Sequence, residues 1–440
     1  MSHKKSDDHK NIVIVGGGAV GVTLARTLSA KINSKTHHIV LINPRPFQVV
    51  LPVSLRFLTS DRDNLQETTL PSYDKLFVDG TGTVVEGKVA SIQKGANKGG
   101  SVTLENGEVI AFEYLVLATG SIFQGPLAFP ETKDDVLPFA EGVRKTIKDA
   151  NDIVLAGGGS VAIELAGEIK DIYPNKNVTI VQGGGHVLND VYPLRFRTFT
   201  EQGLVKRDIK LVLNDYLDDV PTNGFTSVKT RSGSTIKADV VFNARGGRPN
   251  TEFIKSLGPD VLTPEGLVKV RPTLQLVAYD DIFAGGDILD VKEQKQYAKA
   301  LTHANVLAAN ILASISGTNT KLKPYKGSSE LIVITIGKGR GVAYLGILWG
   351  IVLGDCKGTH PLKIREPSKS KVTIDVIHSR NQSSVHQMEN AGLNLSCPSG
   401  VTENYPSQKQ TDHQAGMHRS TTHQRTISQC DHGVQITTSL

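Results

Sequence analysis

Residues 12–21, Ile-Val-Ile-Val-Gly-Gly-Gly-Ala-Val-Gly, decide the fold of this 440-residue chain. The four apolar, mostly β-branched residues predict a buried parallel strand, and an apolar spacing typical of a helix begins at once after them. Gly16 permits a tight turn, Gly18 lets a pyrophosphate approach the backbone, and Gly21 lets helix and strand pack closely. The helix N-terminus offers N–H groups and a partial positive charge to phosphates. The stretch therefore predicts a dinucleotide-binding turn, which also contains Gly17.

The same pattern occurs again about 140 residues later. A predicted strand at 152–156 leads into glycines 157–159 and a helix that carries Ala162 in place of the third glycine, which the pattern tolerates. The next predicted strand, 177–181, ends in Gln182. An acid there would favour NADH by binding the ribose 2′-hydroxyl, whereas a neutral residue does not repel a 2′-phosphate. NADH and NADPH are therefore both open.

Three charged side chains near this second turn have two interpretations each. Glu164 lies in the first turn of the predicted helix, where an acid stabilises the helix dipole, and it also lies where an acid could meet the nicotinamide carboxamide. These two roles are compatible. Arg195 or Arg197 could bind a 2′-phosphate, but ordinary surface charge is the favoured role for both.

After the first turn, a strand is predicted at 38–42 and ends in Asn43, where dinucleotide-binding folds usually place an acid for the ribose hydroxyls. Asparagine can accept a hydrogen bond but brings no charge, so this ribose contact departs from the pattern. Arg45 and Arg56 follow this strand. An arginine just past the strand could reach an anionic cofactor or be a solvated loop arginine, and spacing does not separate the two.

Later segments complete the pattern of a cofactor-binding sheet. Residues 84–92 and 101–110 alternate apolar and polar residues and predict a small antiparallel meander. A buried strand at 114–118 ends in Thr119-Gly120. A short strand before Gly285-Gly286-Asp287 predicts another close approach of the backbone to a cofactor, with Asp287 accepting hydrogen bonds from ribityl hydroxyls. A helix is expected at 297–312.

Composition excludes several classes of function. The formal net charge is +6, and residues 356–440 hold nine basic and six acidic residues, so half of the excess lies there. The rest is nearly balanced, which argues against a nucleic-acid surface. The three cysteines, Cys356, Cys397 and Cys430, form no Cys-x-x-Cys pair, zinc spacing or disulfide framework. No metal site is predicted, and a reducing, cytoplasmic location is expected.

The two ends of the chain carry separate expectations. The charged N-terminus has no signal-peptide pattern, and Ser2 is unsuited to myristoylation. The apolar run 342–353 is too short to span a bilayer, and burial in a core is favoured over a membrane surface. Residues 356–440 are rich in polar residues and predict a disordered tail.

Taken together, these motifs resemble the two-dinucleotide-binding flavoprotein oxidoreductases, in particular the apoptosis-inducing-factor-like group, which includes ferroptosis suppressor protein and fungal relatives. The resemblance covers about residues 10–355. Its most specific part is 153–181, since Gly-Gly-Gly-x-x-x-x-Glu-Leu-Ala-Gly-Glu-Ile is far longer than a bare glycine pattern. The other stretches that carry it are 13–21, 53–56, 115–121, 282–287, Lys295 and 303–305.

The resemblance implies an α/β fold with two Rossmann-like three-layer domains, the NAD(P)H domain inserted in the FAD domain. The implied segments are 10–120 and 246–325 for FAD, 121–245 for NAD(P)H, a short C-terminal β segment at 326–355, and the tail at 356–440. The residues implied to contact FAD or lie beside it are Gly16, Gly17, Gly18, Gly21, Asn43, Arg56, Val89, Thr119, Gly120 and Asp287. Those implied to contact NADH or NADPH are Gly157, Gly159 and Glu164.

The resemblance also implies an activity. Hydride would pass from the nicotinamide to the flavin and then to a small-molecule acceptor, with a quinone favoured, and Lys295 would lie near the flavin and the acceptor. A redox-gated signalling protein with little turnover is the alternative, and a non-functional product is a third. The last arises because relatives carry Trp and an apolar helix where this chain has Cys356 and a polar tail. Peripheral contact with a membrane or lipid droplet, and the oligomeric state, stay open.

Overall fold

The computed structural model describes residues 10–62, 65–222, 224–317, 321–346 and 350–354, together with the backbone of three strands nearer the C-terminus. The chain divides into two compact units. One contains residues up to 337 together with 341–353, and the other contains 338–340 and 354–440. The N-terminal targeting predictions concern residues 1–9 and lie outside the described residues.

The first sheet has five parallel strands in the order β16-β7-β1-β2-β3. They are β1 (Lys10–Val15), β2 (His37–Asn43), β3 (Gly82–Glu86), β7 (Tyr114–Leu117) and β16 (Ile282–Ala284). In the centre, Val13 lies opposite Val40 on one side and Leu115 on the other. Because parallel strands are covered on both faces, the uninterrupted apolar run of β1 suits this central position.

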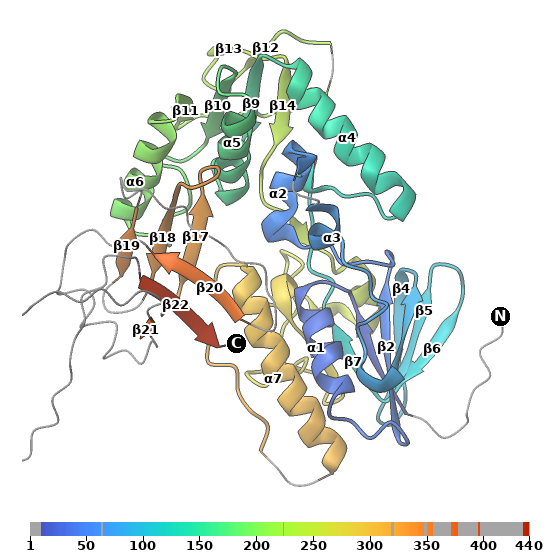
Figure 1. Cartoon of the computed structure of the whole chain (residues 1–440). Coiled ribbons are helices and arrows are strands. Elements are labelled where there is room, and N and C mark those ends of the chain that lie inside the picture. Colours follow the sequence, from blue (N-terminus) through green and yellow to red (C-terminus); the bar gives the residue numbers. More distant parts are fainter. Residues whose placement is uncertain are drawn as a thin grey trace, which may run out of the picture. The chain divides into compact units, whose positions relative to one another are not determined.

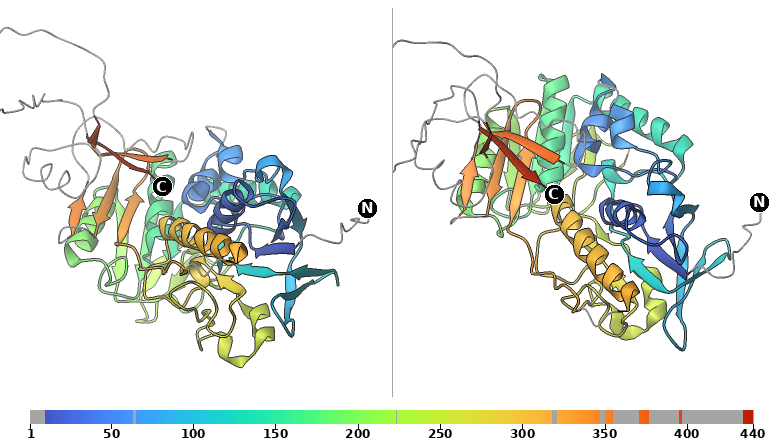
Figure 2. Two further views of the ribbon diagram at one scale, coloured as in Figure 1. Left: turned by 90° about the horizontal axis from the view of Figure 1, so that it is seen from below. Right: turned by 60° about the horizontal axis from the view of Figure 1, so that its bottom comes forward.

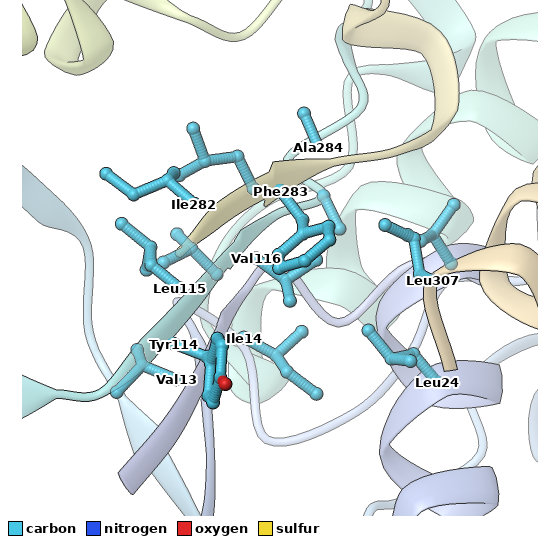
Figure 3. Packing of buried hydrophobic residues seen from close by; sticks show 14 of the residues in the cluster. Val13, Ile14, Leu24, Tyr114, Leu115, Val116, Ile282, Phe283, Ala284 and Leu307 are labelled. Carbon is cyan, nitrogen blue, oxygen red and sulfur yellow. The ribbon is translucent and has the colours of Figure 1, made fainter. Parts of the chain in front are cut away.

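Two helices cover one face of this sheet. α1 (Ala19–Ser29) and α7 (Tyr297–Ser316) pack side by side, as Figures 1 and 2 show. Leu24 of α1 and Leu307 of α7 are fully buried and point toward the side chains of Val116 and Phe283 (Figure 3). Burial of one such leucine stabilises the fold by about 2 kcal/mol. The core therefore holds α1, and the glycine turn before it, firmly against the sheet.

The predicted antiparallel meander includes only the later part of the segment 84–92. The segment divides at Gly87 and Lys88 into β3, which pairs with β2 in the parallel sheet, and β4 (Val89–Lys94). β4 forms the predicted antiparallel meander with β5 (Gly100–Leu104) and β6 (Val109–Phe112). The backbone N–H of Gly87 donates to Asn43 O and marks the turn. The apolar alternation continues through this turn, so it does not reveal the change of sheet.

The second sheet is also parallel, and its strand order is β11-β10-β9-β14. Its strands are β9 (Asp152–Ala156), β10 (Asn177–Gln182), β11 (Ile209–Leu213) and β14 (Val240–Asn243). The helices of this half are α4 (Lys133–Asp149), α5 (Ser160–Ile172) and α6 (Leu194–Val205), and a hairpin of β12 (Ser227–Lys229) and β13 (Thr235–Lys237) is added. The second half is inserted between β7 and β16 of the first, so the predicted fold class is confirmed.

Short elements connect the two halves. β8 (Ser121–Ile122) and β15 (Arg248–Pro249) pair antiparallel where the chain crosses to the second sheet and where it returns. α2 (Leu51–Thr59) packs against α3 (Leu65–Thr69), α4 and α5. Among the described residues, 3₁₀ helices include η2 (Val78–Gly80), η3 (Gly125–Leu127), η4 (Glu252–Leu257), η5 (Pro259–Val261) and η6 (Gly286–Ile288).

A three-stranded antiparallel sheet follows α7 and consists of β17 (Leu331–Thr335), β18 (Gly341–Leu345) and β19 (Ile351–Leu353). Ile334 and Val342 are buried in the same apolar cluster as Ile163 of α5 and Phe196 of α6. The described part of the run 342–353 therefore contributes to a core through β18. Among the described helices, none is both long and apolar enough to cross a membrane.

The second unit contains three short strands whose backbone is described. They are β20 (Lys371–Val376), β21 (Leu395–Ser396) and β22 (Val434–Ser439), in the order β20-β22-β21. The remainder of 356–440, for which the sequence predicts disorder, lies outside the described residues, as do Cys356 and its neighbours.

Candidate functional site

The backbone around the first glycine turn leaves no room for a Cβ at Gly16 or Gly21 but leaves Gly18 open. Gly16 has φ +106°, and a Cβ there would lie 2.4 Å from Ala118 O. A Cβ on Gly21 would lie 1.9 Å from Gly16 O. At Gly18, by contrast, a Cβ would meet nothing within 4 Å, and α1 begins there without a side-chain cap. A pyrophosphate could therefore approach the N–H groups of α1, so the turn fits FAD.

Two side chains hold the middle of this turn. The N–H of Gly17 donates to Asn43 Oδ1 at 2.9 Å, and the Tyr73 hydroxyl donates to Gly17 O at 2.8 Å. Asn43 Nδ2 in turn donates to Arg45 O. Asn43, predicted to bind ribose, thus also anchors the turn itself. Tyr73, whose pKa is raised by burial, was not predicted, because a single aromatic residue in a loop carries no sequence signal for this contact.

The second turn reproduces this arrangement. Gly157 has φ +114°, and a Cβ on Gly159 would meet nothing within 4 Å at the start of α5. The N–H of Gly158 donates to Gln182 Oε1 at 2.9 Å, as Gly17 does to Asn43. Both neutral amides at strand ends therefore accept a hydrogen bond from the second glycine of their turn. The open position at Gly159 fits a second dinucleotide.

The predicted cofactor residues Arg56 of α2 and Glu164 of α5 lie within electrostatic reach of each other, but each has a different hydrogen-bond partner. Arg56 Nη2 lies 2.8 Å from Glu168 Oε1, and Arg56 Nε donates to both oxygens of this largely buried carboxylate. Glu164 accepts from the N–H of Thr335 at 3.4 Å. Burial raises the pKa of Glu164 to about 7, and Glu168 adds to the rise while Thr335 and Arg56 oppose it. Burial therefore favours the neutral form of Glu164 compared with a solvent-exposed carboxyl group.

The ends of β7 and β16 bring further predicted residues together. The hydroxyl of Ser121 donates to Asp287 Oδ2 at 2.8 Å, and that of Thr119 donates to Asn250 O at 2.6 Å. Gly120 has φ +64°, and a Cβ there would meet nothing within 4 Å. Carboxyl ends of adjacent parallel strands meet at one edge of the sheet, where ligands bind in open α/β sheets. Thr119, Gly120 and Asp287 therefore lie at the edge that carries the first glycine turn.

Lys295 lies between η6 and α7. Its Nζ donates to Leu289 O at 2.6 Å. Partial burial of the ammonium lowers the pKa of Lys295, although the negative charges of Asp287, Glu293 and Asp290 oppose this. The structure thus brings a cation of lowered pKa within electrostatic reach of Asp287.

The remaining candidates do not form one cluster with these groups. Val89 is the first residue of β4, where it pairs with Leu104 and packs on the core of the first half. Arg195 is exposed in the first turn of α6, and Arg197 is half-buried two residues later. Their roles toward FAD and a 2′-phosphate stay predictions.

Comparison with known proteins supports the assignment of the two glycine turns to dinucleotide cofactors. FAD-dependent oxidoreductase FVFD30 of Flammulina velutipes is 52% identical over 297 residues, which are 68% of this chain and 92% of that protein. Ferroptosis suppressor protein 1 of Taeniopygia guttata is 30% identical over 345 residues, which are 76% and 88%. Apoptosis-inducing factor homolog B of Dictyostelium discoideum is 28% identical over 364 residues, which are 77% and 90%.

A solved structure with a similar fold and a family model agree with these relatives. The structure of NDH2 from Plasmodium falciparum in complex with NADH has a TM-score of 0.63 at 15% identity and covers 79% of this chain and 92% of that one. The family model for pyridine nucleotide-disulphide oxidoreductases matches residues 10–305, and FAD and NAD(P)H are the cofactors of that family. The resemblance to the apoptosis-inducing-factor-like group is confirmed. This chain belongs to the pyridine nucleotide-disulphide oxidoreductase family.

Proposed function

We propose that this chain passes electrons from NADH or NADPH through FAD to a quinone. Its membership of a flavin-dependent pyridine nucleotide oxidoreductase family supports the first part. The observation that carries the proposal is the pair of glycine turns, since Gly18 and Gly159 each face open space at the start of a helix. Two such turns in one compact unit suit a protein that holds two dinucleotides at once.

The choice of acceptor rests on the cysteines and on the resemblance. The family is named for disulphide reduction, but residues 1–355 contain no cysteine. Electrons therefore have no dithiol in this segment through which to leave, which favours direct reduction of a small molecule. A quinone is the acceptor that the resemblance to ferroptosis suppressor protein implies.

Bound FAD would supply the two-electron chemistry. The chain's own residues would bind and orient the cofactors. The N–H groups that follow Gly18 and Gly159 would receive the two pyrophosphates, and Asp287 would accept from the ribityl chain. Glu164, with a pKa near neutrality, can donate to or accept from the nicotinamide carboxamide. Lys295 would orient the acceptor or balance negative charge on the cofactor.

We further propose FAD segments at 10–120 and 246–325, an NAD(P)H segment at 121–245, and a C-terminal segment at 326–355. The pairing of β8 with β15 supports the two crossings near 121 and 248. Remaining cofactor contacts are proposed for Gly16, Gly17, Gly21, Asn43, Arg56, Val89, Thr119, Gly120 and Gly157. A cytoplasmic location and peripheral contact with a membrane or lipid droplet are proposals as well.

The test is spectroscopic. Purified protein should be yellow, and anaerobic addition of NADH or NADPH should bleach it. A stopped-flow series with several quinones then measures the rate at which each quinone restores the oxidised spectrum. Colourless protein that takes up no FAD on reconstitution contradicts the proposal.

The signalling alternative draws on the similarity to apoptosis-inducing factor homolog B. It predicts a different outcome of the same series. The protein would be reduced by NADH or NADPH, the reduced complex would persist, and every quinone would reoxidise it slowly. Rapid reoxidation by one quinone and slow reoxidation by the others would favour the enzyme.

A further inference from the structure

A buried polar cluster of Glu293, His303 and Tyr325 lies behind the turn that carries Asp287. The side chains of His303 and Glu293 are 2% and 8% exposed, and His303 Nε2 lies 3.0 Å from Glu293 Oε1. The Tyr325 hydroxyl donates to Glu293 Oε2 at 2.6 Å. The Tyr325 ring also meets the imidazole edge-on, with centroids 4.4 Å apart. The imidazole is therefore held by a carboxylate and by an aromatic ring.

The cluster defines which nitrogen of His303 carries a proton. The backbone N–H of Gly286 donates to His303 Nδ1 at 3.2 Å, and an N–H cannot accept. Nδ1 is therefore bare, and the proton lies on Nε2, facing Glu293. Burial alone would raise the pKa of Glu293, but the close contact with His303 and the hydrogen bond from Tyr325 outweigh it and lower the pKa. Glu293 is thus a carboxylate that holds this tautomer in place.

The turn itself is tightly confined. Gly286 has φ +83°, and a Cβ on it would lie 3.1 Å from the side chain of Val20 in α1. A Cβ on Gly285 would lie 2.8 Å from Leu307 of α7. Packing thus limits where the turn can lie, but it does not orient its polar groups. The bond from Gly286 to His303 does so, because it turns the N–H that precedes Asp287 toward α7.

We propose that His303 is a positioning residue for FAD. Its bare Nδ1 holds the Gly286 N–H inward, so that the next residue, Asp287, presents its carboxylate at the open edge of the sheet. Glu293 and Tyr325 act through His303 by keeping Nδ1 free of a proton. This inference rests on the proposed function, since it assigns a role toward the cofactor that the function requires.

The test compares variants of nearly equal size in the full-length protein. His303→Asn keeps an oxygen that can accept from Gly286, whereas His303→Leu removes every polar atom. His303→Gln reaches toward Glu293 but offers nothing close to the place of Nδ1. The FAD dissociation constant is measured by flavin fluorescence, and thermal unfolding of the FAD-free protein is measured in parallel.

We expect FAD binding to be within about threefold of wild type for His303→Asn and weakened roughly tenfold for His303→Leu and His303→Gln, as expected for one lost hydrogen bond. Should His303→Leu fail to fold, His303→Gln against His303→Asn supplies the same contrast. Equal weakening in all soluble variants, or wild-type affinity in His303→Gln, overturns the inference. Wild-type protein that binds no FAD overturns the proposed function instead, so the two failures are distinguishable.

Discussion

At the scale of single residues, Gly18 and Gly159 offer the cleanest test of the two cofactor turns. Both have extended backbone, with φ −82° and −78°, and neither has a neighbour within 4 Å of a Cβ. Alanine should therefore fit the empty protein without strain. In the complex, its methyl group would occupy the place where a pyrophosphate approaches. We expect Gly18→Ala to weaken FAD binding by about tenfold or more, measured by fluorescence titration.

Gly159→Ala is the matched control, because it makes the same change in the second turn. This variant should retain FAD, but low concentrations of NADH or NADPH should no longer reduce that FAD. Thermal unfolding of the FAD-free proteins should be unchanged in both variants. If Gly18→Ala kept its FAD and Gly159→Ala lost it, the assignment of the two turns would be reversed.

The raised pKa of Glu164 predicts how the free energy of unfolding depends on pH. Its pKa is raised to about 7, so the folded protein favours the neutral acid relative to the unfolded chain. Ionisation therefore destabilises the fold progressively as pH rises from about 4.5 to 7 and fully above that. Glu164→Gln, which stays neutral, should raise the free energy of unfolding at pH 8 by roughly 2–3 kcal/mol. The gain should shrink as pH falls toward 4.5.

Denaturant unfolding of wild type and Glu164→Gln at pH 5 and pH 8 measures this difference. A gain that is equal at both values would show that the carboxyl does not titrate between them. The glutamine variant also probes the proposed carboxamide contact, since it can still donate and accept hydrogen bonds. Loss of NADH affinity relative to wild type at pH 8 but not at pH 5 would indicate that the carboxylate form binds the cofactor.

At the scale of elements, the ion pair of Arg56 and Glu168 joins α2 to α5 and therefore joins the two halves of the unit. The Glu168 side chain is 8% exposed, so removing its partner leaves a carboxylate in a poorly solvated place. Arg56→Met should lower the free energy of unfolding by roughly 1–3 kcal/mol. Glu168→Gln, which can still accept from the guanidinium, should cost less. Denaturant unfolding measures both.

The same variants decide whether Arg56 also contacts FAD, as the resemblance predicts. A direct contact requires Arg56→Met to weaken FAD binding while Glu168→Gln does not. If both variants bind FAD as tightly as wild type, Arg56 contributes only the contact between α2 and α5.

Most elements around the site could be predicted because their information is local. The strands before both glycine turns carry uninterrupted apolar runs, and the glycines mark where each helix begins. The division between β3 and β4 was missed because apolar alternation runs through Gly87. The anchoring of Gly17 by Tyr73 was missed for a different reason, since it joins residues 56 positions apart and depends on tertiary packing.

At the scale of the whole molecule, the sequence predicted the two glycine turns but not the hydrogen bonds that hold them. Repeated glycine turns and a late Gly-Gly-Asp sufficed to predict two Rossmann-like domains. The pairing of Gly286 with His303, and of Asn43 and Gln182 with their turns, could not be read from the chain. Each depends on a hydrogen bond between segments that only the finished fold brings together. Spacing along one segment does not encode such bonds.

The insertion of one half in the other predicts that both cofactors react within a single chain. β8 and β15 fasten the two crossings to each other, and Arg56 with Glu168 joins the halves elsewhere. A mixture of Gly18→Ala, which binds FAD weakly, and Gly159→Ala, which binds NADH weakly, should therefore show no more NADH-dependent quinone reduction than the sum of the two variants assayed separately. Steady-state rates of the mixture at increasing protein concentration measure this. Activity that rises with the square of concentration would mean that the FAD of one chain is reduced by nicotinamide held on another.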